Sequence, residues 1–262
     1  GMFRDVPPAF VEAAATPFRD LFKTQTGIEG EVAVVENHEA LAARLQAKTL
    51  HLGVFHGFEW AWVREKHPDL IPLAVTIPPR RPQACLVVKA DAKAATPAEL
   101  KGKCVAIPVG TKAHCDLFLE RLVEGLPVGC CGADRLPDSG PTEVLDAVIE
   151  GKAGAGLLDA GAFAAYQSNY PGKALKLRVL AESDPFPPAV VVYRKDALPS
   201  ADAAKIQAGL VRTKENAQGR AFLMLWKLKG FEDVPAGYEA ELRAASKAYP
   251  APRPVMMTAM PE

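Results

Sequence analysis

The apolar residues of this chain change their spacing repeatedly, from a strand period to a helix period and back. Short apolar runs at 31–36, 50–55, 104–107 and 153–158 predict strands, and the amphipathic segments between them predict helices. Strands that alternate with helices along a sequence favour sheets covered by helices. The pattern therefore predicts an α/β fold.

Two stretches of the chain share one order of elements. "LAARLQAKTLHLGVFHGFEWAW" and "VLDAVIEGKAGAGLLDAGAFAAY" each run from a helical segment through a lysine and a strand to a polar residue and a second helix. The polar residue after the strand is His56 in the first stretch and Asp159 in the second. Because ligands of open α/β sheets bind outside the carboxyl ends of strands, we expect two similar lobes that each offer one such side chain to a shared site.

Two proline-rich stretches predict where the chain passes between these lobes. "PPRRPQA" at 78–84 leaves the first lobe, and "LAESDPFPP" at 180–188 returns to it. We therefore predict a discontinuous first lobe, 1–79 plus 184–262, and a second lobe, 80–183. Two crossings make a two-strand hinge, and hinge closure around a ligand is an established motion of two-lobed proteins.

Charge and hydropathy exclude several classes of protein. The 262 residues include 31 Lys and Arg against 31 Asp and Glu, so the net charge is zero and a general nucleic-acid binder is not expected. No apolar run approaches the roughly twenty residues that span a bilayer. No signal peptide is visible, and Gly1-Met2 is typical of an altered start, so its absence says little about the compartment.

The most informative short stretch is "IPVGTKAHC", in which a predicted strand leads through Gly110, Thr111 and Lys112 into a helix. The predicted helix runs from Lys112 to Val123, and free backbone N–H groups at its start, including that of Ala113, together with a hydroxyl and an ammonium group would make an anion-binding turn. The stretch is not a P-loop, because the G-x-x-x-x-G-K-[ST] spacing is missing. The alternative is an ordinary turn in which Thr111 caps the helix and Lys112 points to solvent.

Three further residues are candidate ligand contacts, each with a structural alternative. Ser139 precedes a predicted helix and either touches a ligand or caps that helix. Asp159 either accepts from a ligand hydroxyl or amine or caps the helix that it opens. His56 follows an apolar strand and is either the polar contact of the first lobe or a structural histidine.

The five cysteines indicate neither a metal site nor a catalytic thiol. No C-x-x-C pair or zinc-type spacing occurs, and we expect no metal and no cofactor. Neighbours on a helix point about 100° apart, so His114 and Cys115 make a poor catalytic dyad. A disulfide from Cys115 to Cys130 or Cys131 stays open.

Several motifs in consistent order make the chain resemble the periplasmic phosphate- and phosphonate-binding proteins of ABC importers. They are "LKGKCVAIP" with the strand-turn-helix after it, "AVIEGKAGAGLLDAGAF", "LRVLAESDPFPPAVVVYRKD" and "KGFEDVPAGYEAELR", and the similarity covers roughly 16–248. The resemblance implies a type II binding-protein fold in which each lobe is a mixed sheet flanked by helices. A small anionic ligand such as phosphonate or phosphate would be clamped between the lobes, and no enzymatic activity is expected. It also implies a membrane permease as partner and a periplasmic or secreted location.

The chain departs from this family where the ligand is expected. The family's hydroxyl-rich Ser-Thr-Ser-Gly turn corresponds to Gly110–Ala113, where only Thr111 keeps a hydroxyl. A Gly-Ser-His becomes Ser139-Gly140-Pro141, and the hinge tyrosine becomes Pro82. Asp159 stands where the family often places an acid. The resemblance therefore implies the fold without implying specificity for phosphonate.

Two other functions fit the same fold. One is an enzyme of cofactor biosynthesis, similar to the thiamine-pyrimidine synthases, which requires a reactive histidine or cysteine cluster. The other is a sensory module whose pocket has degenerated.

Overall fold

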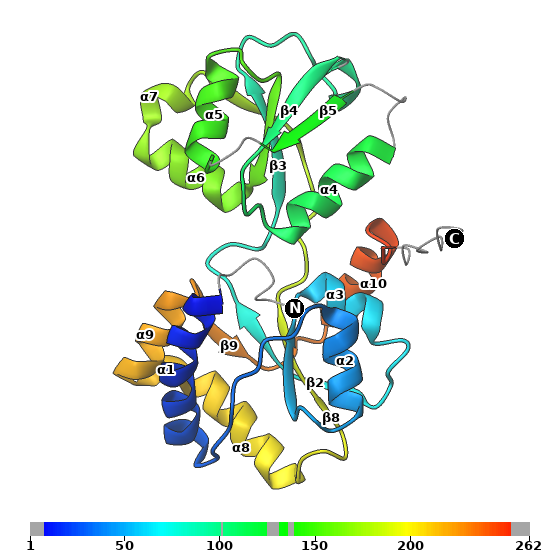
Figure 1. Ribbon diagram of the computed structural model, residues 1–262, viewed down its shortest axis with the longest axis vertical. Helices are drawn as coiled ribbons and strands as arrows, with labels where there is room; N and C mark the ends of the chain where they lie inside the picture. The colour runs from blue at the N-terminus through cyan, green and yellow to red at the C-terminus, as the bar shows by residue number, and fades with distance from the viewer. Residues whose placement is uncertain (1–7, 101, 125–130, 136–138, 253–262) are drawn as a thin grey trace, which may run out of the picture.

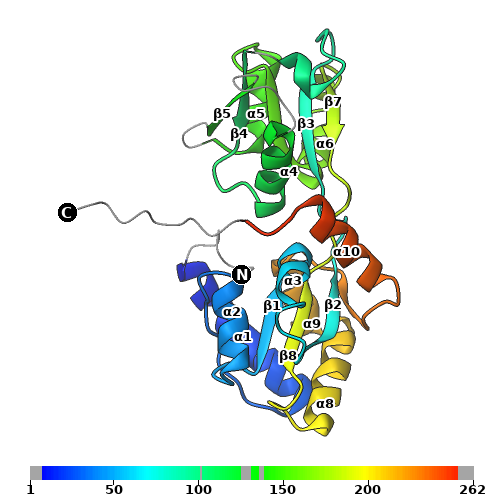
Figure 2. The same cartoon turned by 90° about the vertical axis from the view of Figure 1, so that its right-hand side faces the viewer.

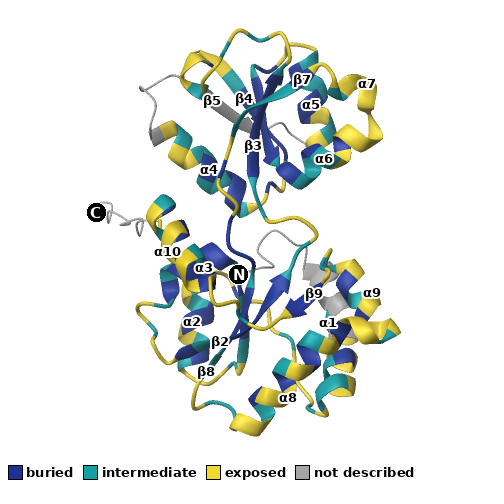
Figure 3. Cartoon of the chain, turned by 180° about the vertical axis from the view of Figure 1, so that it is seen from behind, coloured by how far each residue is buried: buried dark blue, intermediate teal, exposed yellow. Residues whose placement is uncertain are grey.

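The computed structural model describes residues 8–100, 102–124, 131–135 and 139–252. They form two lobes, one above the other in Figure 1, and each lobe contains its own sheet flanked by helices. The predicted α/β fold of two lobes is confirmed. In Figure 3 strand β3 is largely buried, whereas helices such as α7 and α8 expose their outer faces.

The sheet of the first lobe is antiparallel throughout and has the order β1-β8-β2-β9. The mixed sheet expected in this lobe is therefore wrong, because β8, which returns from the second lobe, enters between β1 and β2 in the opposite direction. Its strands are β1 (Leu52–Phe55), β2 (Leu70–Ile77), β8 (Val190–Arg194) and β9 (Gly230–Glu232). Its helices are α1 (Pro8–Thr26), α2 (His38–Gln46), α3 (Gly57–Val63), α8 (Ser200–Val211), the 3₁₀ turn Arg212–Glu215, α9 (Ala217–Leu225) and α10 (Tyr238–Ala248). Helices α1, α8 and α9 pack together, and α3 packs with α2 and α10, so the sheet is covered on both faces.

The sheet of the second lobe is mixed and has the order β5-β4-β6-β3-β7. Its strands are β3 (Ala84–Lys89), β4 (Lys103–Ile107), β5 (Cys131–Arg135), β6 (Ala155–Asp159) and β7 (Leu177–Glu182). Its helices are the 3₁₀ turn Pro97–Leu100, α4 (Ala113–Glu124), α5 (Pro141–Ile149), α6 (Ala160–Asn169) and α7 (Pro171–Ala174). Strand β4 runs parallel to both β5 and β6, and this arrangement positions the candidate site.

The chain crosses between the sheets twice, from β2 to β3 and from β7 to β8, and the two crossings are bonded to each other. Phe186 N donates to Pro82 O at 2.8 Å, and Gln83 Nε2 donates to Ser183 O at 2.7 Å. Ser183 Oγ accepts from Ala84 N at 2.9 Å. The paired crossings form a two-strand hinge, and the lobe boundaries at 79/80 and 183/184 stay a prediction.

One hydrophobic cluster lies on the hinge side and draws on both lobes. Phe58 of α3, Phe186 of the second crossing and Tyr249 after α10 pack with side chains of the second lobe. The buried members from that lobe are Ala84, Leu86, Val88, Leu100, Val105, Ile107, Cys115, Phe118, Ala155 and Leu157. The other cores lie within single lobes.

The strand predicted at 31–36 is wrong. Residues 28–35 lie outside regular secondary structure, and among the described residues this segment pairs with no strand. A cavity of about 820 Å³ is lined by Val32 and Val35 of this segment and by Leu52 and Val54 of β1. Because a strand requires a neighbour for its ladder of hydrogen bonds, the apolar pattern alone does not make one here.

Candidate functional site

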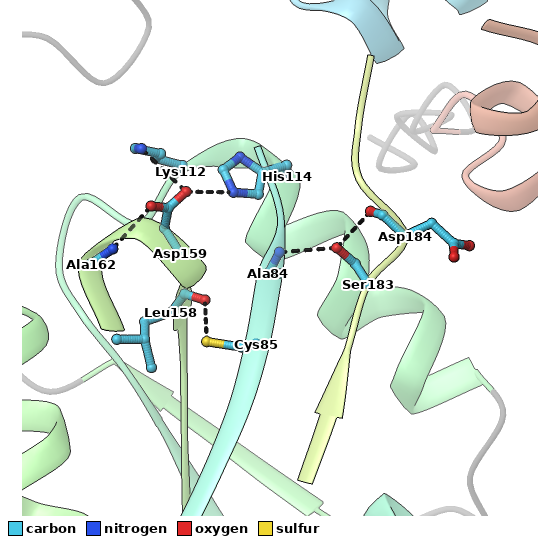
Figure 4. Close-up of polar contacts among 9 residues, drawn as sticks. All are labelled: Ala84, Cys85, Lys112, His114, Leu158, Asp159, Ala162, Ser183 and Asp184. Carbon is cyan, nitrogen blue, oxygen red and sulfur yellow. Dashed lines mark hydrogen bonds and ion pairs between the residues drawn. The ribbon is translucent and has the colours of Figure 1, made fainter. Parts of the chain in front are cut away.

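The candidate site lies where two parallel strands of the second lobe end. Gly110–Ala113 follow β4, and Asp159 is the last residue of β6, its neighbour in the sheet. Because parallel strands end at the same edge, side chains that are far apart in the sequence meet there. Figure 4 shows Lys112, His114 and Asp159 together at the end of the lobe that faces the other lobe.

The turn after β4 requires its glycine and uses its hydroxyl internally. Gly110 has a φ of +70°, in the left-handed region that side chains rarely adopt. Thr111 is buried, and its Oγ1 donates to Pro108 O at 2.7 Å. Val109 N donates to Ser139 O at 2.9 Å, which ties the turn to the chain before α5. Thr111 therefore fastens the turn that presents Lys112 and the first N–H groups of α4.

Asp159 lies at the centre of the site. Its Oδ2 lies 3.2 Å from Nζ of Lys112 and 3.0 Å from Nε2 of His114. Its Oδ1 accepts from Ala162 N at 3.2 Å, so the carboxylate also caps α6. His114 Nε2 is fully buried and has no aligned hydrogen-bond partner within the described part of the chain, so its 3.0 Å approach to Asp159 is a contact without hydrogen-bond geometry. Asp159 caps α6, which is one of its two predicted roles, and its contact with a ligand stays a prediction.

The surroundings of Asp159 keep it ionised. Burial of the carboxylate is the largest single influence on its pKa and acts upward. The contact with His114 and the charge of Lys112 act downward and together prevail, so the pKa of Asp159 falls to about 2. Near neutral pH the site therefore contains a permanent negative charge beside the lysine.

His114 is not among the ligand contacts predicted from the sequence. In the sequence it stands out only as the neighbour of Cys115, with which it makes a poor catalytic dyad. The signal that points to it is topological. When two parallel strands are neighbours, they end at the same edge of the sheet. The first turn of the helix that follows one strand then lies near the last residue of the other strand. That relation joins His114 to Asp159, but it requires knowing that β4 and β6 are adjacent.

Of the other predicted contacts, Ser139 lies beside the turn and His56 lies in the first lobe. Ser139 is buried and precedes Gly140, the residue that caps α5. His56 is half-buried, precedes α3 and stacks on Phe58 with ring centroids 5.2 Å apart. Phe58 lies 5.7 Å from Phe186, which in turn lies 5.5 Å from the ring of His114. A run of aromatic rings thus leads from His56 along the hinge to the site.

The cysteines near the site are buried thiols. Cys115 is a free cysteine of α4, fully buried, and burial raises its thiol pKa well above the ordinary value. Cys85 of β3 donates to Leu158 O at 3.5 Å, and burial raises its pKa to about 12. The possible disulfide partners Cys130 and Cys131 fall where no side chain is described.

Two structural features are absent from the part of the chain that the structure describes. No group of three or more His, Cys, Asp or Glu side chains there is arranged to hold a metal ion. None of the helices in that part is long and apolar enough to cross a membrane.

Sequence comparison identifies the family. The sequence model of a family described as the periplasmic substrate-binding protein of phosphonate ABC transporters matches residues 1–236. The chain belongs to this family. The predicted resemblance is therefore confirmed, and with it the general role of solute-binding component of an ABC transporter. No curated protein matches the sequence.

Solved structures share the fold of this family member at low sequence identity. XAC2383 from Xanthomonas citri bound to chloride ion is 17% identical, with 92% of this chain and 93% of that chain covered and a TM-score of 0.68. PhnD1 from Prochlorococcus marinus in complex with methylphosphonate is 14% identical, with 92% and 93% covered and a TM-score of 0.63. A phosphonate transporter component (PA3383) from Pseudomonas aeruginosa is 14% identical, with 92% and 82% covered and a TM-score of 0.58.

Proposed function

We propose that this protein captures a small anion of the phosphonate or phosphate class between its lobes and delivers it to the membrane permease of an ABC importer. The observation that carries the proposal is the position of Lys112 and the start of α4 at the carboxyl ends of β4 and β6. The helix start supplies N–H groups, the dipole favours negative charge, and Lys112 adds a full positive charge. This delivery takes place in the periplasm or outside the cell.

In the proposed complex each site residue has a stated role. Gly110, Thr111 and Ala113 shape the turn and present its backbone N–H groups, and Lys112 pairs with the anion. Ser139 supports the turn from the start of α5, in line with the bond from Val109 N to its carbonyl. His56 contributes from the first lobe when the hinge closes.

In this proposal the protein binds its ligand without catalysing a reaction on it. An enzyme on this fold needs a reactive thiol or imidazole, and burial holds the pKa of Cys115 far above the range in which a thiolate forms. This buried thiol favours binding over catalysis. A sensory module with a degenerated pocket is the remaining rival, and it predicts no stabilisation by any small anion.

Calorimetric titration with methylphosphonate, inorganic phosphate, sulfate and acetate tests the proposal. We expect saturable binding of the phosphonate or phosphate, and a ligand at 100 times its Kd should add about 2.7 kcal/mol of stability. The double variant Thr111→Ala with Lys112→Ala should weaken that binding at least about tenfold, the equivalent of about 1.4 kcal/mol. Lys173→Ala, which removes an exposed ion pair with Asp146 in the same lobe, is the matched control.

Two results would refute the assignment. One is an unchanged Kd in the double variant, which would place the anion elsewhere. The other is the absence of binding to every anion in the panel, which would favour the sensory module.

A further inference from the structure

The lysine proposed to hold the ligand already has an anionic partner. Nζ of Lys112 lies 3.2 Å from Oδ2 of Asp159, within ion-pair distance. The lysine side chain is 65% exposed, whereas the Asp159 side chain is only 13% exposed. A carboxylate of the protein therefore occupies the place beside Lys112 that a ligand anion needs.

Of the two partners, the carboxylate is fixed and the lysine is free to move. Asp159 is held from three directions, by Lys112, by Nε2 of His114 at 3.0 Å and by Ala162 N at 3.2 Å. The last two contacts remain if Lys112 leaves, as the arrangement in Figure 4 makes clear. A lysine ammonium group on a flexible four-carbon stem reorients easily when it is exposed.

We propose that Asp159 is an internal counter-ion that neutralises Lys112 in the unliganded protein. A ligand anion must compete with this carboxylate for the ammonium group of Lys112. The inference rests on the function proposed above, and it assigns Asp159 a role opposite to that of a ligand acceptor. His114 is then a positioning residue that retains Asp159 when Lys112 turns to the ligand.

This arrangement has a consequence for ligand affinity. The carboxylate is tethered beside Lys112, so its effective concentration there is high and every ligand anion competes with it for the ammonium group. Because Asp159 stays in place when Lys112 turns, its charge also repels the bound anion, and it repels a dianion about twice as strongly as a monoanion. The counter-ion thus weakens the binding of every anion, and it weakens the binding of a phosphonate or phosphate dianion most.

The decisive variant is Asp159→Asn. Asparagine has nearly the same shape and caps a helix as well as aspartate, so α6 keeps its cap while the charge is lost. We expect methylphosphonate at pH 8 to bind Asp159→Asn about tenfold more tightly than it binds the unaltered protein. Acetate, which the fixed charge repels less strongly, should gain by a smaller factor, so the selectivity for the dianion should rise.

A matched control removes the same charge elsewhere in the lobe. Asp146 pairs with Nζ of Lys173 at 2.7 Å and lies outside the candidate site. Asp146→Asn changes the net charge by the same amount as Asp159→Asn, and its Kd for methylphosphonate should stay within about twofold of the unaltered protein. Asp159→Ser, which also caps helices, provides a second neutral variant if the asparagine variant proves unstable.

The outcomes separate this inference from the function on which it rests. A weaker or unchanged Kd in Asp159→Asn and Asp159→Ser would overturn the counter-ion and leave the solute-binding function standing. Equal tightening in Asp146→Asn would also overturn it, because the effect would then come from net charge. If neither the unaltered protein nor the neutral variants bound any anion of the panel, both proposals would fall.

Discussion

Thr111 donates its hydroxyl to the backbone of its own turn, a use that differs from both alternatives expected from the sequence, a ligand contact and a helix cap. The residue is 8% exposed, and its Oγ1 donates to Pro108 O at 2.7 Å. Thr111→Val keeps the shape but leaves that carbonyl without its donor, so the free energy of unfolding should fall by about 1–3 kcal/mol. Urea denaturation measures this loss. Thr111→Ser, which keeps the hydroxyl, should lose much less, and equal stability of the two variants would contradict the argument.

Asp159 should make the stability of the protein depend on pH at the acidic end. Its pKa is lowered from 3.8 to about 2, so its stabilising effect is fully present above pH 4 and is lost as the pH falls through 2. The difference between the two pKa values is equivalent to about 2 kcal/mol. Urea unfolding at pH 6 and pH 2.5 should therefore show that the unaltered protein loses more stability on acidification than Asp159→Asn does. Parallel losses in the two proteins would contradict the lowered pKa.

At the scale of single residues the sequence pointed to several residues of the candidate site but not to their pairings. Lys112 and Asp159 were both candidates because each stands at a helix start after an apolar strand. Their contact, and the part of His114 in it, depends on β4 and β6 being neighbours in the sheet. The sequence does not state that adjacency, because β5 lies between them along the chain and on the far side of β4 in space.

At the scale of elements, capping residues and periodicity predicted the helices well. Asparagine is a favoured helix cap, and the Asn37 side chain accepts from Ala40 N at 2.8 Å at the start of α2. Strands were harder to predict, because a strand exists only through its partner. Among the described residues the apolar segment 31–36 pairs with no strand, whereas Gly230–Glu232 is too short to show a period and pairs with β2.

The start of α3 packs so closely on the second crossing that only glycine fits there. A Cβ built on Gly57 would lie 2.4 Å from Pro187 O, a backbone atom that no side-chain rotation moves away. Gly57→Ala should therefore lower the free energy of unfolding by about 1–3 kcal/mol through overpacking. Gly172→Ala is the control, because nothing lies within 4 Å of the added atom in α7. Chemical denaturation that ranked both variants alike would refute the close approach.

At the scale of the molecule, the two proline-rich stretches correctly predicted a two-strand hinge. What the sequence could not predict is that the chain returns to the hinge after α10. Figure 2 shows the end of that helix at the level where the lobes meet. There Trp62 Nε1 donates to Tyr249 O at 2.7 Å, and the Tyr249 ring lies 4.6 Å from Phe186. The guanidinium of Arg121 in α4 lies 5.2 Å from the same ring.

Tyr249 therefore connects the first lobe, the crossing and the second lobe through one buried side chain. Elements that share a buried cluster unfold together, because neither can lose its contacts without exposing those of the other. We expect the unaltered protein to unfold in one calorimetric transition with equal calorimetric and van't Hoff enthalpies. Tyr249→Ala should lower the free energy of unfolding by about 3–5 kcal/mol, the usual cost of truncating a buried aromatic side chain, and should split the transition in two.

The control for this prediction is Tyr249→Phe, which keeps the ring and its contacts with Phe186 and Arg121 while removing only the hydroxyl. It should retain the single transition. A single transition with matching enthalpies in Tyr249→Ala would mean that the two crossings alone couple the lobes. If the unfolding transition split in two in both variants, the coupling between the lobes would depend on the hydroxyl group. The pair of variants therefore distinguishes the aromatic contact from the polar one.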